Sequence, residues 1–434
     1  MQPRERSEMR ILIVGSGGRE HALAWKIAQS ELVDEVIVAP GNAGIALEPK
    51  CRLVGVSSDD ITRLRQLAEQ ERVDLTVVGP EAPLVAGLAD LFRSADLKVF
   101  GPSSAAAMLE GSKVFTKRLM AKYGIPSSDF QVFEDHQAAV SYVNSFPGPV
   151  VVKADGLAAG KGVFVCPEAQ HAIEALDTIM KTRAFGDAGQ AVVVEECLDG
   201  EEASFIAFTD GKTVLPLASS QDHKPIFDDD KGPNTGGMGA YSPAPVVTRA
   251  IHDQIMSRVM LPVVSALEQE GKPYVGFLYA GLMIKDGVAK VLEFNARMGD
   301  PEAQPLVFRM KTDPVPLMMA ALDEGLSGKE IELEPEDAVC VVISSGGYPG
   351  SYEKGKAIGG IEDAERLHGV KVFHAGTARD HRGFITNGGR VLGVTAKAAG
   401  IGRAIERAYE AVDRISWENV HCRRDIGKKA LNRA

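Results

Sequence analysis

Residues 291–302 read Val291-Leu-Glu293-Phe-Asn295-Ala-Arg297-Met-Gly-Asp300-Pro301-Glu302, an apolar run that passes into a turn. In a β-strand, side chains two residues apart share a face, so Glu293, Asn295 and Arg297 are expected to point the same way. A carboxylate, an amide oxygen and a guanidinium together suit a divalent cation and the phosphate it neutralises. Asp300 is expected as the N-cap of a helix with Pro301 at its first position. Because unpaired buried charges are costly, a functional site is favoured over a strand with a solvated polar face.

Composition limits the classes to which this protein can belong. Its 434 residues suggest two to four domains. A net charge of −11 argues against nucleic acid as the main partner. No apolar run approaches the roughly twenty residues of a membrane span, and residues 1–8 lack the apolar core of a signal peptide. The five scattered cysteines show no metal-ligand spacing, which is typical of reduced thiols in a cytoplasmic protein.

The amino-terminal part alternates strands and helices. Strands are predicted at 10–14, 35–39, 75–79 and 98–101. This alternation indicates a parallel, doubly wound sheet that binds its ligand at the carboxyl ends of the strands. The turns at those ends are expected to form one mouth. Its candidate substrate-binding residues are Gly15, Gly17, Gly18, Arg19, Glu20, Gly41, Asn42, Gly44, Pro80 and Glu81.

The turn Gly15-Ser-Gly17-Gly18-Arg19-Glu20 places backbone N–H groups at a helix N-terminus, where a phosphate can bind. A dinucleotide fingerprint requires a third glycine where Glu20 stands, and an acid after the second strand, which is absent. A smaller phosphorylated ligand is therefore favoured over NAD. A tight turn without a ligand remains the alternative, since glycine turns are common.

A second glycine-rich loop joins two strands between residues 149 and 165. It carries Gly156, Gly160, Lys161 and Gly162, and it is not a Walker A loop, because Gly162 stands where Ser or Thr is required. Such a hairpin can fold over a triphosphate as a lid. A solvated lysine is the alternative for Lys161. Lys153 ends the preceding apolar run and is a further candidate for phosphate binding.

Two other segments are less decisive. The apolar run 191–195 enters the acids of 195–202, which is compatible with nucleotide binding, although surface acids explain Glu201 equally well. The segment 231–243 is rich in Gly, Asn and Pro, so neither helix nor strand is predicted there. It could present N–H groups to an anion, and a plain surface loop is an equal alternative.

The remaining elements complete the expected chain. Strands at 276–284 and 289–295 flank a hairpin turn at Lys285-Asp286-Gly287, and helices follow from about 300 to 326. A last domain begins near 335, with strands at 338–344, 370–374 and 390–395. It has a hairpin turn at Asn387-Gly388 and a closing helix from 402 to about 414.

Taken together, these motifs resemble those of the phosphoribosylamine–glycine ligase (glycinamide ribonucleotide synthetase) family of ATP-grasp enzymes. The resemblance runs from Ile11 to about Lys428. Its most specific part combines Gln221-Asp-His-Lys224 with Pro233-Asn-Thr-Gly-Gly-Met-Gly-Ala-Tyr-Ser-Pro243. It implies an α/β fold with an N-terminal doubly wound parallel-sheet domain (1–110), a central two-part ATP-grasp domain (111–334) and a C-terminal α/β domain (335–434). Residues of about 131–199 would form a mobile subdomain.

The resemblance also implies roles for individual residues. Those expected to bind ATP are Lys113, Lys153, Gly156, Gly160, Lys161, Gly162, Glu195, Glu196, Leu198 and Glu202. Glu293 and Asn295 would ligate Mg²⁺ or Mn²⁺. The expected catalytic residues are Arg297, Asp222 and Lys224. Gly237, Met238, Gly239 and Asp300 would join the N-terminal turns in binding substrate.

The implied reaction joins glycine to 5-phosphoribosylamine through glycyl phosphate, with ATP going to ADP and phosphate. The expected partners are these small molecules alone, in a monomer or weak dimer. A carboxylate that attacks a polyanion must overcome repulsion of about 4 kcal/mol between unit charges at 4 Å in an effective dielectric of 20. Metal and lysines would offset it. Two alternatives remain open: a related ATP-grasp enzyme that activates formate or bicarbonate, and a nucleotide-binding regulator without turnover.

Overall fold

The N-terminal part folds around a five-stranded parallel sheet in a computed structural model that describes residues 9–158, 161–431 and 433. The strand order is β3-β2-β1-β4-β5, with β1 Met9–Gly15, β2 Val33–Pro40, β3 Cys51–Leu53, β4 Leu75–Val78 and β5 Val99–Phe100. Its helices are α1 Gly18–Ile27, α2 Ile61–Gln70, α3 Glu81–Val85, α4 Leu88–Arg93 and α5 Ser104–Gly111, with a 3-10 turn at Ile45–Leu47. The predicted parallel, doubly wound sheet is confirmed.

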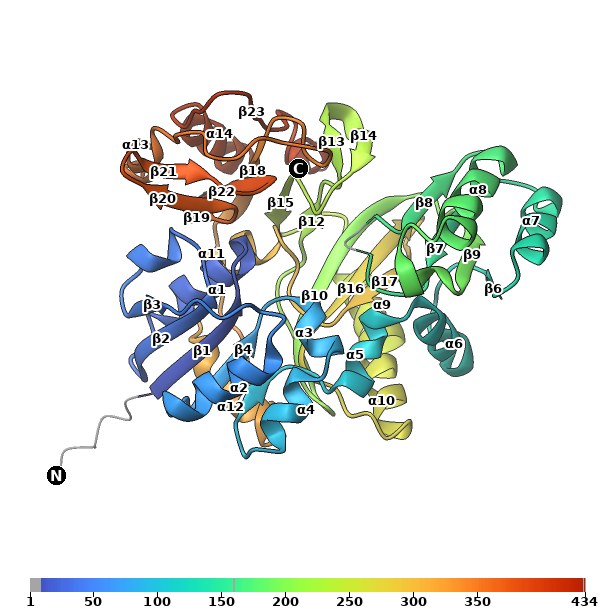
Figure 1. Ribbon diagram of the computed structural model, residues 1–434, viewed down its shortest axis with the longest axis horizontal. Helices are drawn as coiled ribbons and strands as arrows, with labels where there is room; N and C mark the ends of the chain where they lie inside the picture. Colours follow the sequence, from blue (N-terminus) through green and yellow to red (C-terminus); the bar gives the residue numbers. More distant parts are fainter. Residues whose placement is uncertain (1–8, 159–160, 432, 434) are drawn as a thin grey trace.

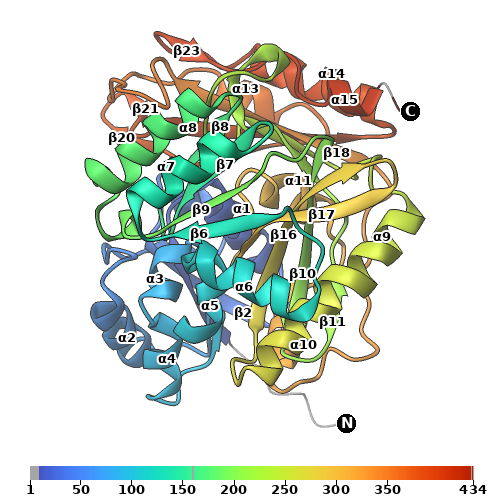
Figure 2. The same cartoon turned by 90° about the vertical axis from the view of Figure 1, so that its right-hand side faces the viewer.

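Two antiparallel four-stranded sheets form the central part. The larger, in order β11-β10-β16-β17, contains β10 Glu201–Asp210, β11 Val214–Pro216, β16 Val275–Lys285 and β17 Val288–Asn295. The predicted hairpin at 285–287 is confirmed, because Lys285 pairs with Val288. Figure 2 shows α9 Arg249–Ile255 and α10 Leu261–Gln269, with a π-helical turn Met256–Met260 between them, lying along this sheet. Helix α6 Lys113–Tyr123 packs against the same elements.

The smaller central sheet has the order β6-β9-β7-β8, and Figure 1 shows it at the right-hand end of the molecule. It consists of β6 Phe130–Phe133, β7 Val150–Ala154, β8 Val163–Cys166 and β9 Val192–Glu196. Its own apolar core lies under α7 His136–Ser145 and α8 Ala169–Leu176, which a π-helical turn Asp177–Lys181 and a 3-10 turn Gly186–Gly189 follow. A separate core permits the two central sheets to enclose a ligand between them.

The C-terminal part is built on a six-stranded sheet in order β12-β15-β18-β22-β19, with β23 paired to β18. Its strands are β12 Gln221–Asp222, β15 Gly239–Ser242, β18 Asp337–Ser345, β19 Val370–His374, β22 Arg390–Ala398 and β23 Val420–His421. Two small ribbons pair β13 Pro225–Phe227 with β14 Lys231–Asn234, and β20 Thr377–Asp380 with β21 Gly383–Thr386. Helix α11 Ala303–Arg309 lies between this sheet and α1, whereas α12 Pro314–Leu322 packs on β10, β16 and β5. The remaining helices are α13 Ile361–Glu365, α14 Ile401–Val412 and α15 Lys428–Leu431, with a 3-10 turn Asp228–Asp230.

Three local expectations were wrong. The glycine-rich segment contains strands β14 and β15, and glycine is what allows β15 to approach β18: a Cβ on Gly239 would lie 2.7 Å from the Cys340 carbonyl oxygen. Asn387-Gly388 is not a hairpin turn, because β21 pairs with β20 and not with β22. Asp300 is not an N-cap, since α11 begins only at Ala303.

Shared cores hold these parts together. Phe277 of β16 contacts Phe208 of β10 and Phe100 of β5, with ring centroids 4.7 and 5.0 Å apart, so the N-terminal sheet packs on the larger central sheet. Phe373 of β19 packs edge-on against Trp25 of α1 at 5.8 Å, which joins the N- and C-terminal parts. In the described part of the chain, no helix combines the length and apolar character that a membrane crossing requires.

Candidate active site

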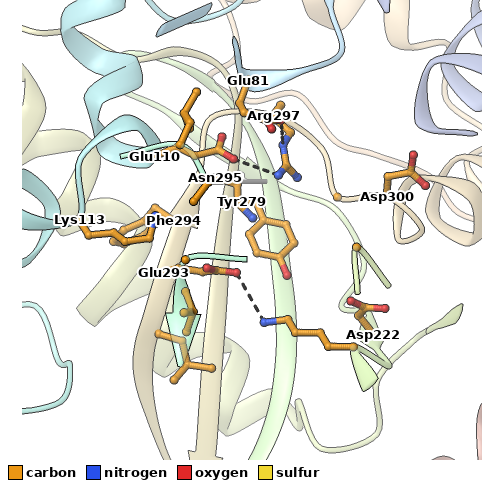
Figure 3. Close-up of a pocket in the computed structure, with 18 of the residues that line it drawn as sticks. Glu81, Glu110, Lys113, Asp222, Tyr279, Glu293, Phe294, Asn295, Arg297 and Asp300 are labelled. Carbon is orange, nitrogen blue, oxygen red and sulfur yellow. Dashed lines mark hydrogen bonds and ion pairs between the residues drawn. The ribbon is translucent and has the colours of Figure 1, made fainter. Parts of the chain in front are cut away.

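A cavity of about 500 Å³ lies where the N-terminal, central and C-terminal parts meet (Figure 3). The carboxyl end of β17 and the turn after it form one wall, because the strand places its polar residues on the cavity side. Of the residues predicted from sequence, those lining the cavity are Arg19, Pro80, Glu81, Lys113, Lys153, Gly162, Asp222, Lys224, Glu293, Asn295, Arg297 and Asp300.

Arg297 is held by acids from two other elements. Its Nε lies 3.1 Å from Glu81 at the start of α3, and its Nη2 lies 3.0 Å from Glu110 of α5 (Figure 3). Glu110 also accepts the backbone N–H of Ala296 at 2.6 Å. Burial opposes the charged form of Arg297, but Glu110 and Glu81 outweigh it and raise the pKa of the guanidinium. Arg297 is therefore a fixed positive charge beside the end of β17.

Glu293 points toward Lys224, with 3.6 Å between the carboxylate and the ammonium group (Figure 3). Chiefly because of Lys224, the pKa of Glu293 is lowered to about 2. The amide of Asn295 satisfies its hydrogen bonds when its nitrogen donates to Glu110 at 3.2 Å and to the Phe294 carbonyl at 3.1 Å. Lys224 also pairs with Glu202 at 3.1 Å, so one lysine links the two acids.

A buried group of two lysines and one acid adjoins the cavity, and both lysines line it. Lys153 donates to the Leu292 carbonyl at 3.0 Å and pairs with Glu195, which also pairs with Lys117 at 2.5 Å. Ser128 donates to the same carboxylate at 2.9 Å. Although burial opposes ionisation, these lysines lower the pKa of Glu195. The Glu195 side chain is thus occupied with lysines and does not line the cavity, and its expected role in ATP binding stays a prediction.

Only some of the other residues expected to bind ATP lie at the cavity. Lys113 donates to the Gly156 carbonyl at 3.2 Å, and Gly162 lines the cavity. Gly160 lies outside the described residues. Those that do not line the cavity are Gly156, Lys161, Glu196, Leu198 and Glu202.

The first glycine turn surrounds a side chain of the chain itself. The carboxylate of Glu20, which is 2% exposed, accepts the N–H of Gly17 at 2.5 Å and the Arg19 guanidinium at 2.7 Å. A Cβ on Gly15 would lie 2.6 Å from that carboxyl carbon. Gly15 and Gly17 make room for Glu20, and Gly15, Gly17, Gly18 and Glu20 do not line the cavity. Their expected role in binding substrate stays a prediction. Arg19 alone of this turn reaches the cavity.

The second glycine turn is similarly occupied. Asn42 donates to the carbonyls of Ser16 and His374, both at 2.8 Å, and accepts the N–H groups of Gly44 and Ile45 at 3.0 and 3.1 Å. A Cβ on Gly44 would collide with the His374 ring. Asn42 and Gly44 therefore join the N-terminal part to β19, whereas Gly41 lies close to Leu53 of β3. These three residues do not line the cavity, and their expected role in substrate binding stays a prediction.

The loop before β15 lines the cavity, but through residues that precede in sequence those expected to bind substrate. Asn234, Thr235 and Gly236 line it, whereas Gly237 lies behind Asp222, and Met238 and Gly239 are buried as β15 begins. Arg390 at the start of β22 fixes this loop by donating to the carbonyls of Gly236 at 2.6 Å and Asp300 at 2.5 Å. The Asp300 carboxylate accepts Gln304 at 2.9 Å and the Arg19 N–H at 3.3 Å.

The wall residues that sequence reasoning missed include Glu110, Lys117, Tyr279, Glu302 and Arg390. Glu302 could have been found, because it closes the same segment as Arg297 and Asp300. No sequence motif marks Glu110 or Arg390. Glu110 lies near the end of α5 and Arg390 begins β22, and each is far along the chain from the segment that it contacts.

Sequence models of one family match three consecutive parts of the chain. The N domain of phosphoribosylglycinamide synthetase matches residues 9–110, its ATP-grasp (A) domain residues 111–303 and its C domain residues 338–429. Relatives of similar length named phosphoribosylamine–glycine ligase include that of Vibrio parahaemolyticus, 53% identical over 98% of this chain and 99% of the relative. That of Escherichia coli is 52% identical over the same shares.

Solved structures agree with this placement. A phosphoribosylamine–glycine ligase from Thermotoga maritima superposes with a TM-score of 0.80 and 33% identity, covering 96% of this chain and all of that one. A biotin carboxylase from Campylobacter jejuni, with 15% identity and a TM-score of 0.74 over 98% of this chain and 95% of its own, shares the fold alone. The chain belongs to the phosphoribosylglycinamide synthetase family of ATP-grasp proteins.

Proposed function

We propose that this chain joins glycine to 5-phosphoribosylamine at the expense of ATP, giving glycinamide ribonucleotide, ADP and phosphate. Relatives that carry the name of this ligase match along almost the whole chain. The observation that carries the proposal is the cavity wall of Glu293, Asn295 and Arg297, because it combines oxygen ligands and a fixed guanidinium at one strand end.

Cations of the wall would bind the triphosphate. Lys113 and Lys153 line the cavity on the side of the smaller central sheet, so ATP would lie between the two central sheets. The hairpin containing Gly162 would close over the phosphates and exclude water from the acyl phosphate. Lys153 is held in place by Glu195 and by the Leu292 carbonyl, which reduces the entropy lost when it binds an anion.

A divalent cation fits the residues present. Glu293 and Asn295 offer a carboxylate and an amide on one strand face, and hard oxygens are what Mg²⁺ and Mn²⁺ prefer. No group of three or more His, Cys, Asp or Glu suited to a metal occurs among the described residues, so phosphate oxygens and water would complete the shell. When bound, the ion would neutralise charge on the transferring phosphoryl group.

The chemistry would proceed in two balanced steps. An oxygen of the glycine carboxylate attacks the terminal phosphorus of ATP, which forms glycyl phosphate and releases ADP. The amine of phosphoribosylamine then attacks the carbonyl carbon, so that an amide bond forms and phosphate and a proton leave. Arg297 would hold the reacting carboxylate and stabilise the charge that develops on it, since Glu81 and Glu110 fix its orientation. No protein nucleophile is required.

The remaining wall would bind the ribose phosphate. Arg19 and Pro80 lie at the carboxyl ends of β1 and β4, opposite the Asn234–Gly236 loop. We further propose that the enzyme is cytoplasmic. Its domain boundaries would lie at about residues 110 and 334, and residues of about 131–199 would form the mobile subdomain. Lys224 would act at the reacting carboxylate and Asp222 would contact the glycine substrate beside it, in a monomer or weak dimer.

Phosphate release from ATP and Mg²⁺ tests the proposal, with glycine and freshly prepared phosphoribosylamine omitted in turn. Release that requires both substrates supports the ligase. Release with formate or bicarbonate in place of glycine would keep the fold and replace the substrate. No release with any acid would favour a nucleotide-binding regulator.

A further inference from the structure

The carboxylates of the cavity wall are unequally neutralised. Four of them pair with a cation: Glu81 at 3.1 Å and Glu110 at 3.0 Å with Arg297, Glu293 at 3.6 Å with Lys224, and Asp300 at 3.6 Å with Arg390. The other two are Asp222 and Glu302, which both line the cavity. Neither has a cationic partner within 4.0 Å among the residues that the structure describes.

Glu302 is the more deeply buried of the two. It is 3% exposed, and one of its oxygens accepts the Ser204 hydroxyl at 3.0 Å. The Tyr279 hydroxyl lies 2.9 Å from the same serine oxygen. Within the described chain, the second Glu302 oxygen has no hydrogen-bond donor, and a Cβ on Gly299 would collide with it. Because Glu302 lines the cavity, this oxygen is open to a hydrogen-bond donor supplied by a ligand.

Asp222 lies on the strand β12 near Glu302. One of its oxygens accepts the N–H of His223 at 2.6 Å, and a Cβ on Gly237 would lie 2.7 Å from that oxygen. Burial and the negative charge of Glu302 raise the pKa of Asp222. A Cβ on Gly237 would also collide with Pro301, the residue before Glu302, so the two carboxylates occupy neighbouring parts of the cavity wall. A cation between them would relieve their repulsion.

We propose that Glu302 and Asp222 bind the ammonium group of the glycine substrate while Arg297 binds its carboxylate. This inference rests on the proposed ligase activity. Arg297 and Glu302 belong to one segment, and Glu302 is among the charges that favour the ionised guanidinium of Arg297. The cavity thus presents a cation beside two anions, the arrangement that a zwitterionic amino acid matches and that an acid such as acetate or formate does not.

The arrangement would also suppress a side reaction. Glycine carries an amine of its own, which could attack glycyl phosphate and form a dipeptide. Two carboxylates that bind the amino group stabilise its protonated form, and an ammonium nitrogen has no lone pair with which to attack. The amine of phosphoribosylamine would then be the one available nucleophile.

The decisive variant is Glu302→Gln, which keeps the shape and removes the charge. We expect the KM for glycine to rise at least about tenfold, because one of two buried charge partners is lost, while the KM for ATP changes less than about twofold. Acetate provides a second measurement, since it lacks the ammonium group. The ratio of kcat/KM for glycine to that for acetate should fall by a similar factor in the variant.

Two variants serve as matched comparisons. Asp222→Asn removes the other charge and should also raise the KM for glycine and lower selectivity over acetate, which keeps the inference testable if Glu302→Gln does not fold. Glu334→Gln removes an acid that pairs with Lys311 at 3.7 Å away from the cavity, and it should change neither quantity.

Failure of this inference differs from failure of the proposed function. If the wild-type protein releases phosphate with glycine but both charge-removing variants keep its glycine KM, the ammonium site is rejected and the ligase stands. An equal loss of activity with glycine and acetate also rejects it. If the wild type shows no glycine-dependent release, the ligase is rejected, and calorimetry then decides the site: glycine should bind and acetate should not, whereas equal binding overturns it.

Discussion

The amino-terminal glycine turns and the cavity at the end of β17 have similar sequence signals and opposite structures. In the turns, the chain satisfies its own polar groups: Glu20 accepts the Gly17 N–H, and Asn42 makes five hydrogen bonds to backbone groups. In the cavity, charged groups face open space, and Glu302 and Asp222 lack cationic partners among the described residues. The difference teaches that a glycine-rich turn predicts a backbone path, whereas incomplete neutralisation predicts a ligand.

Arg297→Ala should have the largest effect. The guanidinium is expected to stabilise charge that develops during phosphoryl transfer, so kcat should fall by about 10²–10³, as for the loss of one transition-state donor. The KM for ATP should change little, because Lys113 and Lys153 remain. Steady-state phosphate release at varied ATP gives both constants.

The same variant leaves Glu81 and Glu110 without their shared cation, so its stability must be measured beside its activity. Removing one partner of a buried pair costs about 3–5 kcal/mol. Arg297→Ala combined with Glu110→Gln should recover part of that stability without recovering kcat. Turnover at the wild-type rate in a folded Arg297→Ala protein would remove Arg297 from the mechanism.

Glu293→Gln should have the next largest effect, on the metal. The substitution keeps an oxygen but removes the charge that favours a divalent ion, so the metal concentration for half-maximal activity should rise by at least about tenfold. Titration of Mg²⁺ and Mn²⁺ at saturating substrates measures it. Asp199→Asn, which breaks an exposed pair with Lys285, provides the control. The same metal dependence in both variants would contradict the assignment of Glu293 as a ligand.

Asn42→Ala tests the glycine turns, where the chain satisfies its own polar groups. If Asn42 is structural, its loss leaves buried backbone groups unpaired and lowers the free energy of unfolding by about 2–3 kcal/mol. The KM for phosphoribosylamine should stay within about twofold, since Asn42 does not line the cavity. Urea unfolding and steady-state kinetics separate the two results. A large rise in that KM without loss of stability would restore its substrate role.

The sequence predicted the regular elements better than it predicted their polar contacts. Short, continuous apolar runs that alternate with helical segments predicted the parallel sheet, because its strands are buried on both faces. That Glu293 and Asn295 share a face of β17 was predictable because the period of two is local, and Arg297 follows just beyond the end of the strand. Glu110 and Arg390 could not be predicted, because each meets Arg297 or Asp300 only after distant elements pack.

Glycine was the residue most often misread. In 231–243 it suggested an irregular loop, yet Gly239 lies in β15 because the strand passes close to Cys340. At Gly15 and Gly44 it suggested space for a phosphate, yet the space is filled by Glu20 and His374. A sequence shows that a side chain is absent at such positions, but the folded chain decides what occupies the room.

His374 gives the smallest expected effect and tests whether the contact between β19 and the Asn42 turn is a stable, dry one. Burial lowers the pKa of His374 to about 3, whereas an unfolded histidine has a pKa of 6.5. Between these values the unfolded state binds more protons, so the free energy of unfolding should fall on acidification below pH 6.5, by about 1.4 kcal/mol per pH unit for each such group. His374→Gln should remove its share of this slope, and exposed His381→Gln should not. The slope from His223, whose pKa burial lowers to about 4, remains in both. The slopes are measured by urea unfolding from pH 7 to 5. Equal slopes in the two variants would mean that water reaches His374 in solution and that the contact between β19 and the Asn42 turn is not dry.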